Sequence, residues 1–241
     1  MVKFAFCIFT YGEDCYMLGQ CIRALRKLGA TRSNIFVFDD AKQPLPYPPP
    51  NTQYKQTVFD RKGNLNGYEC TDGELLCMLE ASKQCKADVI VKVDSDVIIN
   101  SLEWILNNDF MNSHCGFIIG EASHISGCTY SLPTWAIVPM LRKLKTLPNN
   151  TVTGESIIVT ELASKVGLEK VGYLCNYKNS DMWLASSITD DSLKPDGTIT
   201  SHSLGVMTNL QVVLCDLIAT RRNKYRNYLL MKHYLDYTNT P

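Results

Sequence analysis

Asp94 and Asp96 are separated by a single residue and directly follow the apolar run Val89 to Val93. Such a run indicates a buried strand, and residues i and i+2 of a strand point to the same side. Two carboxylates this close together repel each other unless a positive charge lies between them. A divalent cation with oxygen ligands, itself holding a phosphate, is the usual counter-charge. The alternative is an ordinary strand followed by a solvated turn, so the pair gains weight only from other residues.

Two other predicted strands also end in polar side chains. Thr10 and Tyr11 follow the first apolar run of the chain, and Asp39 and Asp40 follow the second. Ligands of an open α/β sheet bind beyond the carboxyl ends of its strands, so we expect these residues and the acid pair to meet at one edge. A hydroxyl and an aromatic ring suit a nucleobase, and carboxylates accept hydrogen bonds from base or ribose groups. The sequence therefore predicts a nucleotide site at this edge.

The chain lacks the glycine-rich signatures that hold phosphates. Neither G-x-G-x-x-G nor G-x-x-x-x-G-K-[ST] occurs, so classical dinucleotide binding and P-loop phosphate transfer are not supported. A bound cation would instead have to neutralise the phosphates. Arg61, in the Gly- and Asn-rich segment 61–67, is a candidate contact for a diphosphate, and a solvated loop is the alternative interpretation.

Alternating strands and helices are expected to position these residues. Helical spacing of apolar residues predicts helices at about 14–28, 71–85, 101–106, 133–144, 154–167 and 208–236. Short apolar runs predict strands at about 2–10, 35–38, 54–59, 89–93, 117–120 and 169–175. Thr71 and Glu74 match a capping box, which sets the start of the second helix at Thr71.

This alternation is typical of an α/β fold with a Rossmann-like, mixed and mostly parallel sheet flanked by helices. We expect a single domain over residues 1–241. Its nucleotide-binding half would cover 1–100, its acceptor-side half 101–207, and a C-terminal helix 208–241.

Composition excludes several classes of protein. The chain has 241 residues, of which 45% are hydrophobic and 20% charged, and its formal net charge is zero. A full core is therefore expected, without a general basic field to attract nucleic acid. No apolar window is long enough for a membrane span, and the N-terminus lacks a secretory signal. Ten cysteines without a CxxC pair favour reduced thiols, so we expect a cytoplasmic protein.

Three blocks of the sequence resemble a known family of enzymes. The first runs from Tyr68 to Asn100 and contains a helix ending in Cys85, then Lys92 and the two acids. The second is GlyCysThrTyrSerLeu from residue 127, and the third is the acid-led helix over 154–167. These blocks resemble the GT-A glycosyltransferases, which bind a nucleotide sugar through a D-x-D motif and a divalent cation. Within them the likeness is greatest to the beta-1,3-glycosyltransferase group.

The resemblance implies a metal-dependent, hexosyltransferase-type enzyme. Asp96 would be the main metal ligand, Asp94 would contact ribose or metal, and His202 would be a third ligand. The cation would be manganese, with magnesium as the alternative. The donor would be a nucleotide-diphosphate sugar, with a UDP-sugar favoured. Glu155 falls where the family has its catalytic base, which favours inversion at the anomeric carbon.

This chain departs from the family pattern in two respects. The family usually has two acids in the third block, whereas Gly154–Glu155–Ser156 has one. Glu155 could instead only stabilise the start of a helix, where the dipole favours a carboxylate. We also expect no membrane anchor of the kind that the family usually has, because no apolar window of the sequence is long enough.

Two other functions and several acceptors remain open. A nucleotidyltransferase would also carry paired aspartates, but its glycine- and lysine-rich phosphate loop is missing. A glycosyltransferase-like binding protein without turnover is the other alternative. The acceptor would be a glycan, a small molecule or a modified nucleic acid contacted by the basic segment 221–234. A helix whose cations face water is the simpler interpretation of that segment.

Overall fold

The computed structural model describes residues 2–10, 15–40, 45, 47–57, 67–95, 97–99, 101–118, 123–148, 153–174 and 182–184. Within these residues a seven-stranded sheet has the order β3-β2-β1-β4-β7-β6-β8. Its strands are β1 (Phe4–Thr10), β2 (Ile35–Asp39), β3 (Gln53–Gln56), β4 (Val89–Asp94), β6 (Ser113–Ile118), β7 (Thr129–Pro133) and β8 (Glu169–Leu174). A separate antiparallel pair is formed by β5 (Val97–Ile99) and β9 (Met182–Leu184).

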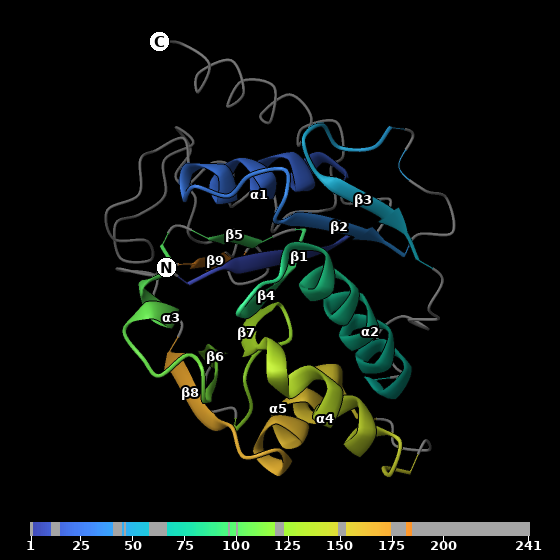
Figure 1. Cartoon of the computed structure of the whole chain (residues 1–241), viewed down its shortest axis with the longest axis vertical. Coiled ribbons are helices and arrows are strands. Elements are labelled where there is room, and N and C mark those ends of the chain that lie inside the picture. Colours follow the sequence, from blue (N-terminus) through green and yellow to red (C-terminus); the bar gives the residue numbers. More distant parts are fainter. Residues whose placement is uncertain are drawn as a thin grey trace, which may run out of the picture.

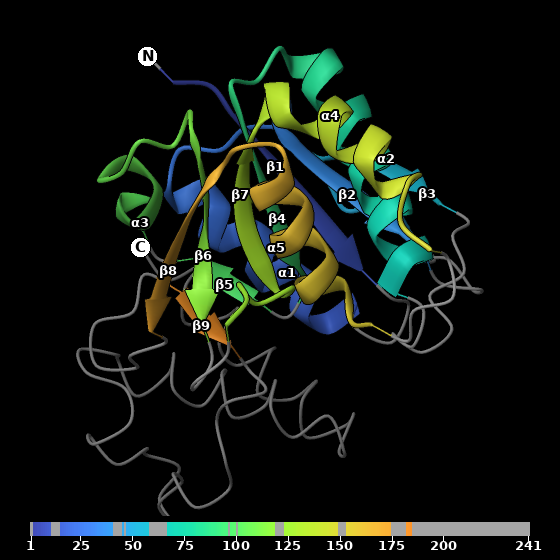
Figure 2. The same cartoon turned by 90° about the horizontal axis from the view of Figure 1, so that it is seen from below.

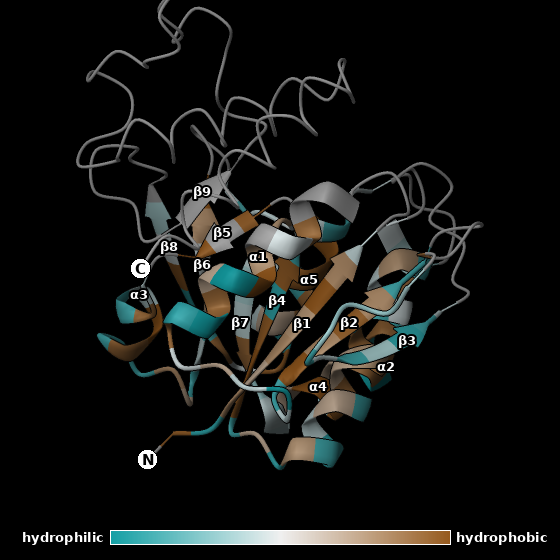
Figure 3. Ribbon diagram, turned by 90° about the horizontal axis from the view of Figure 1, so that it is seen from above, coloured by the Kyte–Doolittle hydropathy of each residue, from teal (hydrophilic) through white to brown (hydrophobic). Residues whose placement is uncertain are grey.

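The sheet is mixed and mostly parallel. Strands β3, β2, β1 and β4 are parallel to one another, and β8 is parallel to β6. Strand β7 is the exception, because it runs antiparallel to both of its neighbours, β4 and β6. The central strands are apolar on both faces because helices cover both faces, as the hydropathy colours along β1 and β2 show in Figure 3.

Helices lie on both faces of this sheet (Figure 1). Helix α1 (Cys15–Lys27) covers one face, and α2 (Gly67–Cys85), α4 (Thr134–Leu144) and α5 (Glu155–Lys165) cover the other, as Figure 2 shows from below. The short α3 (Glu103–Leu106) packs beside β6. One apolar cluster lies between the sheet and α1, and a second lies between the sheet and the other three long helices.

The predicted α/β class, with a mixed and mostly parallel sheet flanked by helices, is therefore confirmed. The predicted C-terminal helix over 208–236 lies outside the described residues. Of the helices that the structure describes, none combines the length and the apolar character that crossing a membrane requires.

The predicted start of α2 was wrong. The helix begins at Gly67, and the Thr71 hydroxyl donates a hydrogen bond at 2.7 Å to the Gly67 carbonyl, one turn back in the same helix. Glu74 does not cap the helix either, because its side chain is fully buried and lies 3.6 Å from Lys92. The pattern of a capping box occurs here inside a helix, where the backbone N–H groups already have partners.

Two strands also differ from the predicted bounds. Strand β6 begins at Ser113 rather than at 117. The prediction relied on an apolar run, and it missed Ser113 and His114 because they are polar, although both are buried. The small-residue stretch over 127–132 folds largely into β7. In both places tertiary packing buries residues whose composition is not that of an apolar strand.

Candidate functional site

A lysine lies at the centre of the charged cluster at the carboxyl end of β4. Lys92 is only 1% exposed, although it carries an ammonium group. Side chains alternate along a strand. Ile90 belongs to the apolar cluster under α2, α4 and α5, whereas Val91 and Val93 belong to the cluster under α1. Lys92 and Asp94 have the same parity as Ile90, so both side chains lie on the α2 and α5 face of the sheet.

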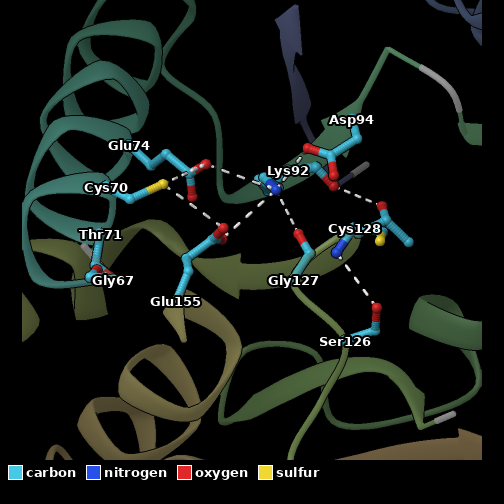
Figure 4. Close-up of polar contacts among 11 residues, drawn as sticks. Gly67, Cys70, Thr71, Glu74, Lys92, Asp94, Ser126, Gly127, Cys128 and Glu155 are labelled. Carbon is cyan, nitrogen blue, oxygen red and sulfur yellow. Dashed lines mark hydrogen bonds and ion pairs between the residues drawn. The ribbon is translucent and has the colours of Figure 1, made fainter. Parts of the chain in front are cut away.

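Three carboxylates and one carbonyl surround the Lys92 ammonium (Figure 4). Its Nζ lies 2.7 Å from Asp94 Oδ1, 3.5 Å from Glu155 Oε1 and 3.6 Å from Glu74 Oε1. It also donates a hydrogen bond to the carbonyl oxygen of Gly127. A buried charge is costly unless it is paired and hydrogen-bonded, and this arrangement provides both.

Aromatic rings from the two strands beside β4 flank the same ammonium. Nζ lies 5.8 Å from the ring centroid of Phe9 on β1 and 5.9 Å from that of Tyr130 on β7. Both distances are within the range of cation–π attraction. Burial raises the pKa of the Tyr130 phenol well above its usual value, and the nearby acids Glu74 and Glu155 raise it further. Tyr130 therefore carries no charge in this cluster at neutral pH.

The starts of two helices bring Glu74 and Glu155 to Lys92. Glu155 is the first residue of α5, and Glu74 lies in the second turn of α2. The two helices begin side by side, and a Cβ on Gly67 would lie 1.9 Å from the Thr153 carbonyl oxygen and 2.8 Å from the Glu155 backbone nitrogen. Only glycine allows this approach.

The segment before β7 closes the other side of the cluster. The Asp94 N–H donates a hydrogen bond at 2.8 Å to the Cys128 carbonyl, and the Cys128 N–H donates to Ser126 Oγ at 3.3 Å. A Cβ on Gly127 would lie 3.3 Å from Glu155 Oε2. The glycine therefore lets the Glu155 carboxylate lie directly against the backbone whose carbonyl accepts the hydrogen bond from Lys92.

The four charged groups differ in their exposure to solvent. The side chains of Glu74 and Lys92 are 0% and 1% exposed, whereas those of Glu155 and Asp94 are 18% and 27% exposed. A ligand arriving at the carboxyl edge of the sheet would therefore meet Asp94 and Glu155, with the lysine behind them. Among the residues that the structure describes, three carboxylates surround one ammonium, and an excess of acid favours the approach of a cation.

A thiol joins the two glutamates on their other side. Cys70 Sγ lies 3.7 Å from Glu74 Oε1 and 3.8 Å from Glu155 Oε2. One ligand atom from each of these three residues falls within 4.8 Å of the other two, a spacing that could hold a metal ion. The Lys92 ammonium already provides a positive charge between the two glutamates, however, so a metal there would compete with it.

Two of the residues predicted at the other strand ends, Thr10 and Asp39, are buried. Thr10 is 1% exposed, and its carbonyl accepts a hydrogen bond at 3.2 Å from the half-buried Asp40 N–H. Asp39 is fully buried, and its Oδ2 accepts hydrogen bonds at 2.8 Å from the Leu45 N–H and from the Tyr54 hydroxyl. Asp39 thus fixes Leu45 and Tyr54 through hydrogen bonds. Its predicted contact with a nucleotide stays a prediction.

Four predicted site residues lie outside the described residues: Tyr11, Arg61, Asp96 and His202. The structure does bring together Asp94 and Glu155, which the sequence placed in the same site from separate motifs. Glu74 and Cys70 were not predicted as parts of it. Lys92 offered a signal, because a cation inside an otherwise apolar strand needs buried carboxylates as partners.

Comparisons with known proteins give likenesses of structure only. The chain matches no protein-family profile and no curated protein sequence. The glycosyltransferase GlyE of Streptococcus pneumoniae TIGR4 is similar with a TM-score of 0.40 and 9% identity, over 72% of this chain and 45% of the GlyE chain. This chain thus spans less than half of GlyE.

A second structure is that of a glycosyltransferase involved in the glycosylation of the major capsid of PBCV-1. It is similar with a TM-score of 0.43 and 12% identity, over 73% of this chain and 85% of that one. At such scores and identities neither likeness bears on the chemistry of the site, so the case for a function rests on the residues described above.

Proposed function

We propose that this protein is a glycosyltransferase that moves a sugar from a nucleotide-diphosphate sugar to an acceptor hydroxyl. The observation that carries the proposal is the sharing of one buried ammonium by Asp94 and Glu155. The two acids come from different elements and both reach solvent at the carboxyl edge of the sheet, where α/β proteins bind ligands. Two acids on opposite sides of one ammonium provide one group for the donor and one for the acceptor.

Glu155 is the proposed general base. It begins α5, and the helix dipole and the Lys92 ammonium both stabilise the negative charge that a base must carry. Its side chain is 18% exposed, so an acceptor hydroxyl can reach it. Attack by that hydroxyl on the anomeric carbon, on the face opposite the leaving diphosphate, would invert the configuration there.

Asp94 is proposed to act on the donor side, together with Asp96 and His202 and a manganese or magnesium ion. Asp94 suits a cation because it is a partly exposed carboxylate in a cluster where the described residues include more acids than bases. One of its oxygens lies 2.7 Å from Lys92, so we assign the larger share of metal binding to Asp96. A bound cation would offset the charge that develops on the leaving diphosphate. A UDP-sugar is the favoured donor.

The test is release of nucleoside diphosphate. The full chain is incubated with manganese or magnesium and a panel of nucleotide sugars, with and without a mixture of acceptors. We expect release with one donor, stopped by chelation of the metal and by Asp94→Asn. The matched control is Asp88→Asn, which also removes a carboxylate next to β4, but at the opposite end of the strand. No release with any donor would contradict the proposal.

Two further measurements separate the two alternatives. A nucleotidyltransferase would release pyrophosphate from a nucleoside triphosphate and a sugar phosphate. A binding protein without turnover is the other alternative, in which both acids stay paired with Lys92 when a nucleotide sugar binds. It would bind a nucleotide sugar in calorimetry and release nothing.

A further inference from the structure

We infer that Glu74 is a positioning residue for Glu155 and acts on it through Lys92, an inference that rests on the proposed function. Glu74 is fully buried, so it cannot touch a substrate at the edge of the sheet. Its Oε1 nevertheless lies 3.6 Å from the ammonium that Glu155 contacts at 3.5 Å.

The position of the Lys92 ammonium is set by groups on two opposite sides. Asp94 and the Gly127 carbonyl lie on one side, and Glu74 and Glu155 lie on the other, as Figure 4 shows. The contacts with Asp94 and Gly127 are the shorter ones. The ammonium would therefore move further toward Asp94 if the opposite side lost a charge, because the attraction of each carboxylate acts along its own direction.

Glu74 attracts the Lys92 ammonium away from Asp94, and because Glu74 is buried a substrate cannot disturb this attraction. Glu155 must approach an acceptor, and Asp94 must approach a donor, so both exchange partners during a reaction. Glu74 belongs to α2, and the first residue of this helix packs against the start of α5. Its carboxylate thus keeps the ammonium beside Glu155 while the two exposed acids bind ligands.

Cys70 supports the same geometry from the side away from Lys92. Its Sγ lies within 3.8 Å of an oxygen of each glutamate. It lies one turn before Glu74 on α2, so the helix presents the thiol and the carboxylate together. The thiol lies between the two glutamates on that side. A carboxylate that turned away from Lys92 would therefore also lose its contact with the thiol.

The test compares Glu74→Gln with Glu80→Gln. Each removes one charge from α2 with little change of shape, but Glu80 is a surface acid, 38% exposed, that pairs with Lys55. With the donor and acceptor that the wild type uses, we expect Glu74→Gln to lower kcat roughly tenfold to a hundredfold, because the base would be misplaced. The KM for the donor should change by less than about twofold. Glu80→Gln should leave both constants unchanged.

A purely structural role predicts a different result. Glu74→Gln would then lower the amount of folded protein and leave kcat per folded molecule as in the wild type, which would overturn the inference. If Glu74→Gln does not fold, Glu74→Asp keeps the charge but shortens the side chain. A smaller loss of kcat with an unchanged KM would support the inference, and a wild-type kcat would overturn it.

A crystal structure of the same variant separates this inference from the proposed function. In Glu74→Gln we expect Nζ of Lys92 to lie closer to Asp94 and further from Glu155 Oε1 than the present 3.5 Å. An unchanged distance would overturn the positioning role. A wild type that uses no donor would count against the proposed function, and the distance would still decide the inference.

Discussion

Gly67 and Thr153 are in such close contact that a Cβ on Gly67 would lie 1.9 Å from the Thr153 carbonyl oxygen. This contact joins the first residue of α2 to the residues that lead into α5. It therefore sets the distance between the two helices that bring Glu74 and Glu155 to Lys92. The geometry of the site therefore depends on Gly67, because any side chain at this position would push the two helices apart.

Gly67→Ala should be destabilising and should also lower activity. The new methyl group meets backbone atoms, which cannot turn away, so we expect a loss of about 1–3 kcal/mol in the free energy of unfolding. Moving α2 from α5 should also lower kcat. The control is Gly19→Ala in α1, where nothing lies within 4 Å of the added atom. Urea denaturation should show that variant to be as stable as the wild type or about 0.5–1 kcal/mol more so.

Lys92→Met should be far more destabilising than an equivalent change at the surface. It leaves the three carboxylates without the ammonium that they share, and breaking a buried pair costs about 3–5 kcal/mol. Lys55→Met removes a lysine that is 52% exposed and pairs with one surface acid, so it should cost less than about 1 kcal/mol. Equal losses in a denaturation experiment would mean that Lys92 does not hold the cluster together.

Gly127→Ala should change activity more than stability. Its Cβ would lie 3.3 Å from Glu155 Oε2, and a carboxylate at the end of a side chain can move aside at little cost. We expect the free energy of unfolding to fall by less than about 1 kcal/mol and kcat to fall roughly tenfold, because a base must be closely placed. Gly154→Ala, beside Glu155 but with open space around the added atom, should keep the wild-type kcat. A wild-type kcat in Gly127→Ala would argue against Glu155 as the base.

The sequence predicted several strands of the sheet close to their observed places because long apolar runs are a local signal. The strands β1, β2 and β4 and the helices α1 and α5 lie close to their predicted places. Asp94 and Glu155 were placed in one site by separate motifs, and the structure brings both to Lys92, but their roles stay predictions. What joins them was not predicted, because it depends on contacts between distant segments. The burial of Glu74 follows from the packing of α2 against α5. The local sequence pattern instead predicted that Glu74 belongs to a helix cap, which was wrong.

Lys92 is a residue whose partners the sequence could have predicted in part. It has the same parity in the strand as Asp94, and a lysine with apolar residues on both sides is not expected to stay unpaired. This reasoning predicts that carboxylates surround it, but it cannot say which ones. The sequence prediction assigned the neutralisation of the paired acids to a metal alone, whereas the structure places an ammonium 2.7 Å from Asp94.

The last prediction concerns the acid stability of the fold. His114 on β6 is 1% exposed, its ring lies edge-on against that of Tyr130, and neither ring nitrogen has a hydrogen-bond partner among the described residues. Burial, with a smaller contribution from Lys170, lowers the pKa of His114 to about 3. An unfolded histidine has a pKa of about 6.5. Between these values the unfolded chain binds a proton that the folded chain excludes, so His114 makes the fold less stable as the pH falls.

His114→Phe should remove this effect while keeping a ring against Tyr130. Below pH 6.5 the wild type should lose about 1.4 kcal/mol of unfolding free energy per pH unit through this one residue. The difference in stability between variant and wild type should therefore be constant from pH 7 to 8 and shift in favour of the variant from pH 6 to 4. Urea denaturation at a series of pH values measures this difference. A difference that does not change with pH would mean that His114 takes up its proton in the folded protein as readily as in the unfolded chain.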